Sequence, residues 1–496
     1  MVLDALKPIL DNLPEVKSPA RAPGLKDKLL WTGGVLLIFF LMGQVYPVGV
    51  EQGVIQGFER FEILLGSRTG TLITTGIGPI VLASIFLQLA VGAKLLNLDL
   101  SNPENKKKFQ GLQKLLAIFL ALVEGFIYAR SIVLPIDGST AALFAANAMF
   151  GLITPGGLMV MLQLALGSIF LLYMDEVCQK YGIGSGVSLF IAAGVAQAIF
   201  VGSFGTLGLD VLNGKTTEPS GIIPSMLFNI FRGDVSKAFW TMFPLVFTII
   251  VFLGTVYAEG MKIELPLAYG GARGLGARYP IKFLYVSNIP VILASALLLN
   301  VQVIGLFMAQ AGVPLLGQFD MSQTINGTLI QGSNRPLPFD QGGGFAALTT
   351  ALPSPLFQGY EAYIQSYLLN PGELFHILVY GIVLIVLCVV FGWFWIESTG
   401  MGPANVAAQL NKSGMQIPGF RQDPRITEKI LNKYIPVITI LGSIFVGFLA
   451  WFADITGALG TGTGILLTVG ILYRFYEDLA QQQIFEMYPV LKRLSR

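Results

Sequence analysis

The chain contains 496 residues, of which 54% are hydrophobic and only 12% are charged. An average globular protein carries roughly 25% charged residues, so a soluble chain of this length would lack the charge needed to cover its surface. The net charge of +2 excludes a strong basic field for nucleic acid. The single histidine, His376, excludes metal sites with several histidines, and we expect neither a cofactor nor an enzymatic activity. The composition predicts a polytopic membrane protein.

Residues 1–28 carry five basic residues ahead of the first long apolar run. A cleavable signal peptide needs a short apolar core near its start, which this segment does not have, so we expect none. Leucine and isoleucine recur at helical spacing over Leu3–Leu13. This spacing favours an amphipathic helix on a membrane surface, and a disordered tail is the alternative that the sequence leaves open.

Ten apolar runs follow, each close to the ~20 residues that a helix needs to span a bilayer. An even number of spans places both termini on the same side of the membrane. The segments on that side hold 24 of the 31 lysines and arginines, so the positive-inside rule predicts that both termini are cytosolic. We predict transmembrane helices near residues 29–49, 76–95, 112–134, 157–176, 184–207, 238–259, 284–304, 373–396, 433–454 and 458–476.

The predicted spans divide the chain into two halves of five helices. Within the second half we expect cytosolic loops at 258–283 and 397–433. We also expect partly folded external structure at 302–372, which is rich in Gly, Pro, Gln and Asn. The expected order is a cytosolic N-terminal segment at 1–28, a first half at 29–207, an external loop at 208–237, a second half at 238–476 and a cytosolic tail at 477–496.

Residues 57–70 mix charged and apolar side chains just before the second predicted span. Their charges exclude a lipid-facing span, because they would lie in hydrocarbon. Non-helical backbone at this depth is tolerated only inside protein or beside water. We therefore expect a short helix that dips into an outer cavity before the span begins.

Two sequence patterns occur once in each half. Pro79–Ser84 matches Pro290–Ser295, in the second and seventh spans, and Gly182–Leu189 matches Gly460–Leu467, in the fifth and tenth. Each pair is five spans apart, and because five is odd the two halves insert with opposite orientation. The sequence therefore predicts a 5+5 inverted repeat, which builds a site or a pore near the membrane centre.

An inverted repeat is compatible with two classes of function, a channel and a secondary transporter, because secondary transporters also use inverted repeats. Glu124 lies ten residues after Lys114, about 15 Å along a helix, and is the one carboxylate that we place near mid-bilayer. It is either a proton relay or a group that hydrogen-bonds a neighbouring helix.

These motifs resemble signatures of the SecY family. The segment from Thr71 to Gln88 is similar to its first signature, and the segment from Asp175 to Gly186 to its second. Thr75, Cys178 and Gln179 depart from the residues usual in the family, and segments 205–237 and 302–372 look longer than typical. The similarity runs from about residue 3 to residue 494. The resemblance is to archaeal members in particular at Tyr279–Phe283, at Ser287–Pro290, and at Gly457–Leu459 with Thr463 and Gly464.

The resemblance implies an all-α fold in which ten transmembrane helices form a 5+5 inverted-repeat clam shell around a central pore. A lateral gate between spans two/three and seven/eight would carry Glu124 and Asn300, and its third polar position is Leu82 here. An aliphatic ring would close the pore at Ile77, Val81, Val187, Ile191, Ile292 and Leu467. A plug would be formed by Glu59, Arg60, Phe61, Glu62, Ile63, Leu64, Leu65, Gly66, Ser67, Arg68 and Thr69.

The resemblance also implies a function without covalent chemistry. Members of the family conduct unfolded secretory polypeptides across the membrane and release transmembrane segments sideways into lipid. The implied partners are SecE (gamma) and small beta subunits, the ribosome, signal sequences and nascent chains, and membrane lipid, in the plasma membrane of the cell. The basic residues expected to dock on ribosomal RNA are Arg273, Arg278, Lys282, Arg421 and Arg425.

Two alternatives stay open. Basic loops also follow from the positive-inside rule alone, without any docking function. A secondary transporter would show saturable uptake of a small solute that depends on Glu124, whereas a protein-conducting channel would copurify with ribosomes and small single-span subunits.

Overall fold

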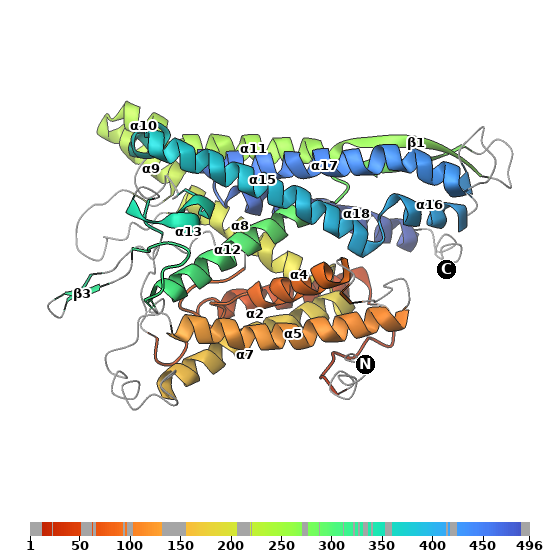
Figure 1. Ribbon diagram of the computed structural model, residues 1–496, viewed down its shortest axis with the longest axis horizontal. Coiled ribbons are helices and arrows are strands. Elements are labelled where there is room, and N and C mark those ends of the chain that lie inside the picture. The colour runs from red at the N-terminus through yellow and green to blue at the C-terminus, as the bar shows by residue number, and fades with distance from the viewer. Residues whose placement is uncertain are drawn as a thin grey trace.

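The computed structural model is mostly helical, and ten long helices form its body (Figure 1). The structure describes the chain apart from residues 1–11, 22, 51–61, 63–65, 93–94, 97–102, 131–154, 206–218, 220, 270–275, 287, 311, 321–322, 326–327, 331–335, 339–340, 353–359, 413–414, 417–423 and 488–496. The ten helices are α2 (Leu25–Met42), α4 (Gly78–Gly92), α5 (Pro103–Arg130), α7 (Pro155–Tyr181), α8 (Gly186–Phe204), α11 (Phe243–Gly260), α12 (Ile289–Gln310), α15 (Pro371–Thr399), α17 (Pro424–Thr456) and α18 (Gly462–Met487).

Each of the ten predicted spans coincides with one of these helices. Several helices run past the apolar run itself: α5 begins nine residues before residue 112, and α18 continues beyond residue 476. Within the described residues, seven helices are long and apolar enough to cross a membrane by length and composition. The other three are α4, which has 15 residues, and α2 and α18, which carry charged residues near one end.

The two halves of the chain form two layers (Figure 1). Helices α2, α4, α5 and α7 lie together on one side, α11, α15 and α17 lie on the other, and α8 and α12 run between them. The packing of α4 on α5 and of α5 on α7 is repeated by α12 on α15 and α15 on α17. The contact of α7 with α8 is repeated by α17 with α18. The second half thus repeats the neighbour relations of the first.

Shorter elements gather at the two ends of the bundle. One end carries β1 (Lys262–Tyr269), which pairs antiparallel with β2 (Gly276–Lys282) and with β5 (Met415–Gln416), and α16 (Pro403–Lys412). The opposite end carries α9 (Ile222–Arg232), α10 (Val235–Thr241), α13 (Gly344–Thr349), and β3 (Gln323–Ile325) paired with β4 (Thr328–Ile330). Near this second end lie α14 (Tyr360–Tyr363) and the π-helical turn η3 (Ile364–Leu368), which contacts α15. The β-strands were not expected from the sequence. In β1 apolar residues alternate with polar or small ones, as in Ile263-Glu264-Leu265.

The segments predicted to share the cytosolic side lie at one end of the molecule. Residues 12–21, the β1–β2 hairpin, α16 and the end of α18 are all found there. The predicted amphipathic helix at Leu3–Leu13 falls mostly on residues 1–11, outside the described part of the chain.

The largest apolar cluster lies where the two layers meet and draws residues from both halves. Many large apolar side chains are exposed on the outer surface, such as Leu166 and Ile382, each 62% exposed. A soluble monomer rarely exposes so much apolar surface, whereas lipid is as apolar as these side chains. The surface therefore suits a bilayer, and the protein is a multi-pass membrane protein.

Candidate functional site

A cavity of about 310 Å³ lies between the two halves. Helices α4, α5, α7 and α8 of the first half and α12, α15 and α18 of the second supply its walls. Lys114 and Glu176 bind the segment 12–21, at the end that carries β1 and β2. Polar residues of the cavity lining lie close to them in sequence: Gln113 precedes Lys114, Asp175 precedes Glu176, and Gln179 follows Glu176 by three residues. The cavity thus has a polar mouth at the end where the basic segments gather.

Away from this mouth the lining is mostly aliphatic, with Ser84 and Ser188 beside the aliphatic side chains. Five of the six residues predicted to form a ring line the cavity: Val81, Val187, Ile191, Ile292 and Leu467. The sixth, Ile77, lies about one helical turn before Val81 and is completely buried in the same apolar cluster. The structure therefore brings all six together, from four helices or their immediate starts, although they span 390 positions from Ile77 to Leu467.

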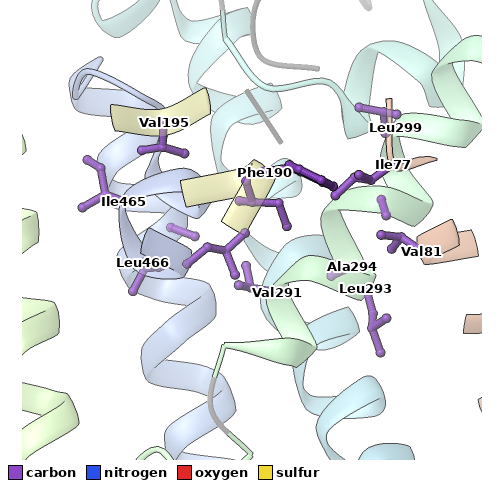
Figure 2. Packing of buried hydrophobic residues seen from close by; sticks show 14 of the residues in the cluster. Ile77, Val81, Phe190, Val195, Val291, Leu293, Ala294, Leu299, Ile465 and Leu466 are labelled. Carbon is purple, nitrogen blue, oxygen red and sulfur yellow. The ribbon is translucent and has the colours of Figure 1, made fainter. Parts of the chain in front are cut away.

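Figure 2 shows how the neighbouring side chains close the space behind the ring. Phe190 of α8 lies in the middle, with Ile465 and Leu466 of α18 on one side and Ile77 and Val81 on the other. Val291 and Ala294 of α12 pack from below and are completely buried. The residues labelled in this view belong to the buried apolar cluster, which packs against the ring from both halves.

Short polar contacts fix the start of α4, which carries Ile77 and Val81. The Thr75 and Ser168 hydroxyls are hydrogen-bonded to each other, and Ser168 Oγ also donates to the Gly76 carbonyl oxygen at 2.9 Å. Gly167 allows this approach, because a Cβ there would collide with the carbonyl of Leu72. The glycine-rich and threonine-rich run before α4 is therefore held against α7.

Part of the predicted plug lies directly beside the ring. Of its residues, the structure describes Glu62 and Gly66–Thr69, and the others lie outside the described residues. Glu62 Oε1 accepts a hydrogen bond from the Thr69 backbone N–H at 2.8 Å, which closes this segment on itself. A Cβ at Gly66 would stand 3.4 Å from the Phe190 side chain, so the segment rests on the residue that adjoins Ile191.

The two predicted gate residues lie on α5 and α12. Helix α4 packs against both α12 and α15, so the seam between the halves is closed here. Glu124 is 9% exposed, and its Oε1 has no hydrogen-bond partner among the described residues. Asn300 Nδ2 donates to the Ala296 carbonyl oxygen of its own helix at 2.8 Å. Leu82, at the third position, is buried in the central apolar cluster.

The predicted docking residues are described only in part. Lys282 Nζ forms an ion pair with Glu477, 2.8 Å from Oε1, which ties β2 to α18. Arg425 is exposed near the start of α17. Arg273, the Arg278 side chain and Arg421 lie outside what the structure describes.

Side chains of α5 and α7 bind the segment 12–21 at the same end. Lys114 is hydrogen-bonded to Glu176 and to the Pro14 carbonyl oxygen, and the Val16 N–H donates to Glu176 Oε2 at 3.0 Å. The Lys180 ammonium lies 2.8 Å from Glu15 Oε1, and this hydrogen bond and charge lower the pKa of the Glu15 carboxyl from its usual value.

Comparisons with known proteins point to one family. A model of the SecY family matches residues 71–476. The chain is 42% identical over 493 residues to the protein translocase subunit SecY of Methanothermobacter thermautotrophicus, covering 99% of this chain and 98% of that protein. It is 42% identical over 492 residues to the subunit of the same name from Methanocaldococcus jannaschii, covering 99% of each. The chain belongs to the SecY family.

Solved structures agree with this SecY membership. The fold matches one described as the structure of a protein conducting channel, with a TM-score of 0.76, 41% identity and 98% of each chain covered. It also matches Sec61 in the canine ribosome-channel complex from the endoplasmic reticulum, with a TM-score of 0.74, 40% identity and 98% of each chain covered. The ten-helix fold expected from the sequence is therefore confirmed, as is the predicted family.

The sequence did not predict that polar residues line the mouth of the cavity. Arg474 and Gln179 line it. Gln179 lies near the end of α7, three residues after the predicted apolar run, and Arg474 lies in the middle of α18, close to the end of its predicted run. A charge that follows an apolar run by a few residues is the available signal, but it indicates a membrane boundary equally well. Which of these side chains turn toward the cavity depends on how the SecY helices pack.

Proposed function

We propose that this chain is the central, channel-forming subunit of a Sec translocase, conducting unfolded secretory polypeptides through the cavity between its halves. The observation that carries the proposal is the aliphatic ring that ends a polar-mouthed cavity at the seam of an inverted repeat. The relatives are translocase subunits, and one structural neighbour is described as a protein conducting channel.

The ring at Ile77, Val81, Val187, Ile191, Ile292 and Leu467 acts as the seal. A constriction of bulky aliphatic side chains repels water, so ions meet a dewetted barrier even where the gap is not closed sterically. The same side chains move apart around a passing chain and offer no polar group that would hold it. This supports passage of polypeptides of any sequence with little leakage of ions.

The plug at residues 59–69 would cover the ring from the side opposite the mouth. Its described residues rest on Phe190, next to the ring residue Ile191. A solved relative is described as having a plug domain that stabilises the closed state and maintains a membrane seal. In this chain the plug adds to the seal that the ring provides.

The lateral gate would open where α4 and α5 face α12 and α15. A signal sequence or a nascent transmembrane helix parts this seam and enters lipid by its own hydrophobicity. Glu124 and Asn300 are the polar residues of this gate. Glu124 Oε1 has no donor among the residues that the structure describes, and a buried acceptor without a donor destabilises the state that buries it.

The partners and the orientation follow from the same proposal. The chain forms a heterotrimer with SecE (gamma) and a small beta subunit in the plasma membrane, with both termini in the cytosol. The ribosome docks at the end with the β1–β2 hairpin, using Arg273, Arg278, Lys282, Arg421 and Arg425. A related structure is of Sec61 in a ribosome-channel complex.

Planar-bilayer recordings of the purified complex test the seal. Val81→Asn combined with Ile292→Asn hydrates the ring, and we expect a higher resting ion conductance and a relaxed requirement for a signal sequence. Phe86→Asn with Ile304→Asn is the matched control, because these side chains lie on the same two helices but are exposed on the surface. If the ring variant is as tight as wild type while a Glu124 variant abolishes flux of a small solute, the proposal is wrong.

Labelling of single cysteines tests the orientation. Lys262→Cys lies on the hairpin and Leu315→Cys at the opposite end, and both side chains are exposed. An impermeant thiol reagent added outside intact cells should modify position 315 and spare position 262. The reverse pattern would overturn the orientation without affecting the proposed channel.

Ribosome binding tests the docking surface. Arg421→Glu should weaken binding to ribosomes, with a shallower dependence of affinity on salt because one contact with phosphate is lost. Arg232→Glu, at the opposite end of the molecule, is the control. Unchanged binding of the Arg421 variant across a salt series would leave the basic loop explained by membrane topology alone.

A further inference from the structure

Helices α8 and α18 begin in related ways in the two halves. Each follows one of the glycine-rich segments that match in sequence, Gly182–Leu189 and Gly460–Leu467. The first N–H groups of a helix have no partner inside the helix, and a buried helix start needs acceptors from elsewhere. Both starts are buried here, since Gly186 and Gly462 are buried residues.

An aspartate from the preceding helix supplies the acceptor for α8. Asp175 Oδ1 accepts from the Val187 backbone N–H at 3.0 Å and from Ser185 Oγ at 2.9 Å. Its Oδ2 accepts from Gln179 Nε2 at 2.7 Å. The carboxylate is 8% exposed, so it satisfies the helix start from inside the protein.

A second aspartate does the same for α18. Asp454, in the last turn of α17, accepts from the Gly462 backbone N–H through Oδ1 at 3.1 Å. Its Oδ2 accepts from the Tyr380 hydroxyl of α15 at 2.8 Å, and the residue is 5% exposed. Asp175 precedes Gly182 by seven residues and Asp454 precedes Gly460 by six, so the two aspartates occupy nearly equivalent places in the repeat, and the N–H groups that they accept from, Val187 and Gly462, are offset by three positions.

Glycine at each helix start lets the capped helix approach the helix that caps it. A Cβ at Gly186 would lie 2.6 Å from the Asp175 Cα, and a Cβ at Gly462 would collide with the Ala450 carbonyl. Backbone contact and a carboxylate cap therefore act together at both junctions. Such a contact leaves the helix start little freedom to shift.

The fixed helix starts carry half of the aliphatic ring. Val187 and Ile191 lie in the first two turns of α8, and Leu467 lies in the second turn of α18. A displacement of either helix start moves these side chains by a similar amount, because one or two turns of helix behave as a rigid body. The separation between ring residues depends on where the two starts are held.

We propose that Asp175 and Asp454 are a symmetry-related pair of positioning residues that hold Val187, Ile191 and Leu467 in the closed ring. This proposal rests on the channel function proposed above for the ring itself. This role requires no contact of either aspartate with a translocating chain, although Asp175 lines the cavity. Each acts through the backbone N–H groups of the helix that it caps, with the negative charge placed at the positive end of the helix dipole.

The test measures thiol accessibility and conductance together. Ser188→Cys on α8 and Ile471→Cys on α18 are the reporters, since both side chains line the cavity. The native Cys178 and Cys388 are fully buried and give little background. We expect Asp175→Ala to speed labelling at position 188, and Asp454→Ala to speed it at position 471, about fivefold each, as for loss of one helix cap. Both variants should also raise the resting ion conductance.

Conservative variants separate positioning from general stability. Asp175→Asn and Asp454→Asn keep an acceptor oxygen at the helix start, so labelling should stay within about twofold of wild type. Glu176→Gln on α7 and Thr439→Val on α17 are the controls, because Glu176 binds the segment 12–21 and Thr439 donates within its own helix. Neither control should change labelling or conductance.

The outcomes distinguish this proposal from the channel function on which it rests. Unchanged labelling in the alanine variants, or equal labelling of the asparagine and alanine variants, overturns the positioning role. Faster labelling with wild-type conductance supports positioning and contradicts the ring as the seal. If Asp175→Ala does not fold, Ser185→Ala removes one donor to the same carboxylate, and it should speed labelling about twofold; wild-type labelling would again overturn the proposal.

Discussion

At each of the two helix junctions, α7–α8 and α17–α18, an aspartate caps a buried helix start, but the surroundings of the two aspartates differ. At the first, Asp175 lines the cavity, and its neighbour Glu176 binds the segment 12–21. At the second, Asp454 is covered by Tyr380 and lies away from the cavity lining. The repeat therefore preserves what the backbone requires, an acceptor and a glycine at a buried helix start. It leaves the side-chain environment free to differ between the halves.

The starts of α4 and α12 differ more. Thr75 stands four residues before Pro79, and Val286 stands four residues before Pro290. Thr75 is hydrogen-bonded to Ser168 in a buried polar cluster, whereas Val286 packs in an apolar cluster with Ile281 and Ile435. Position 75 is thus held by a hydroxyl hydrogen bond and position 286 by apolar packing, while the neighbours Tyr285 and Asn288 donate hydrogen bonds to the Met401 and Leu466 carbonyl oxygens.

The largest expected effect comes from adding a methyl group where the two backbones touch at each junction. Gly462→Ala should lower the free energy of unfolding by about 3 kcal/mol and Gly186→Ala by slightly less, since both insert a methyl group into a close-packed contact. Gly254→Ala in α11 is the control, because its nearest atom would be 3.9 Å away. Thermal unfolding in detergent, followed by a dye that reacts with Cys178 and Cys388 as they become exposed, measures the difference. A wild-type midpoint for Gly462→Ala would contradict the contact.

The next effect compares the ion pairs that tie each half to the same end. The Lys114 and Glu176 side chains are 10% and 19% exposed, whereas those of Lys282 and Glu477 are 40% and 37% exposed. Lys114→Met should cost about 2 kcal/mol, because it leaves a partly buried carboxylate unpaired. Lys282→Met should cost less than about 1 kcal/mol. The same thiol-dye assay measures both, and equal losses would show that burial does not separate the two pairs.

A smaller effect is expected from replacing the Thr75 hydroxyl before α4 by an apolar side chain, as at Val286 before α12. Thr75→Val keeps the shape but removes one hydroxyl, and we expect a loss of about 1 kcal/mol. Val286→Thr is the reciprocal variant and should also destabilise, because its hydroxyl enters an apolar cluster. A stabilised Thr75→Val protein would show that the hydroxyl pair is not needed for the fold.

The smallest effect concerns the segment 12–21 and the pH dependence of the stability that the Glu15–Lys180 pair contributes. Because Lys180 lowers the pKa of Glu15, the folded state binds the proton less tightly than the unfolded state. The resulting stabilisation is present above the ordinary carboxyl pKa and is lost as the pH falls through the lower folded value. The midpoint difference between wild type and Glu15→Gln should be small at pH 7, smaller in high salt, and absent once the pH is below the folded pKa of Glu15. A difference that grows toward acid pH would contradict the pairing.

The sequence predicted the ten helices because each rests on a local property, the hydropathy of about 20 consecutive residues. It also predicted the six ring positions and the repeat, and the structure brings those six side chains into one cluster. The helix ends were less accurate, since α5 and α18 continue as helices into charged sequence where hydropathy gives no signal. The β1–β2 hairpin was not anticipated, because its residues fall within segment 258–283, which was interpreted only as a basic cytosolic loop between two apolar runs.

By itself, the sequence determined the number of spans, the two halves and their opposite orientation, since apolar run lengths and a repeated pattern suffice for these. Only the tertiary structure decided that Asp175 and Asp454 cap the helices that follow them, that Lys282 pairs with Glu477, and that Ile77 lies behind the cavity lining while Val81 lines it. The physical reason is that burial in lipid is a property of a segment, whereas a hydrogen bond or an ion pair needs two groups within about 3 Å of each other. For residues 195 positions apart, only the packing of the helices fixes that distance.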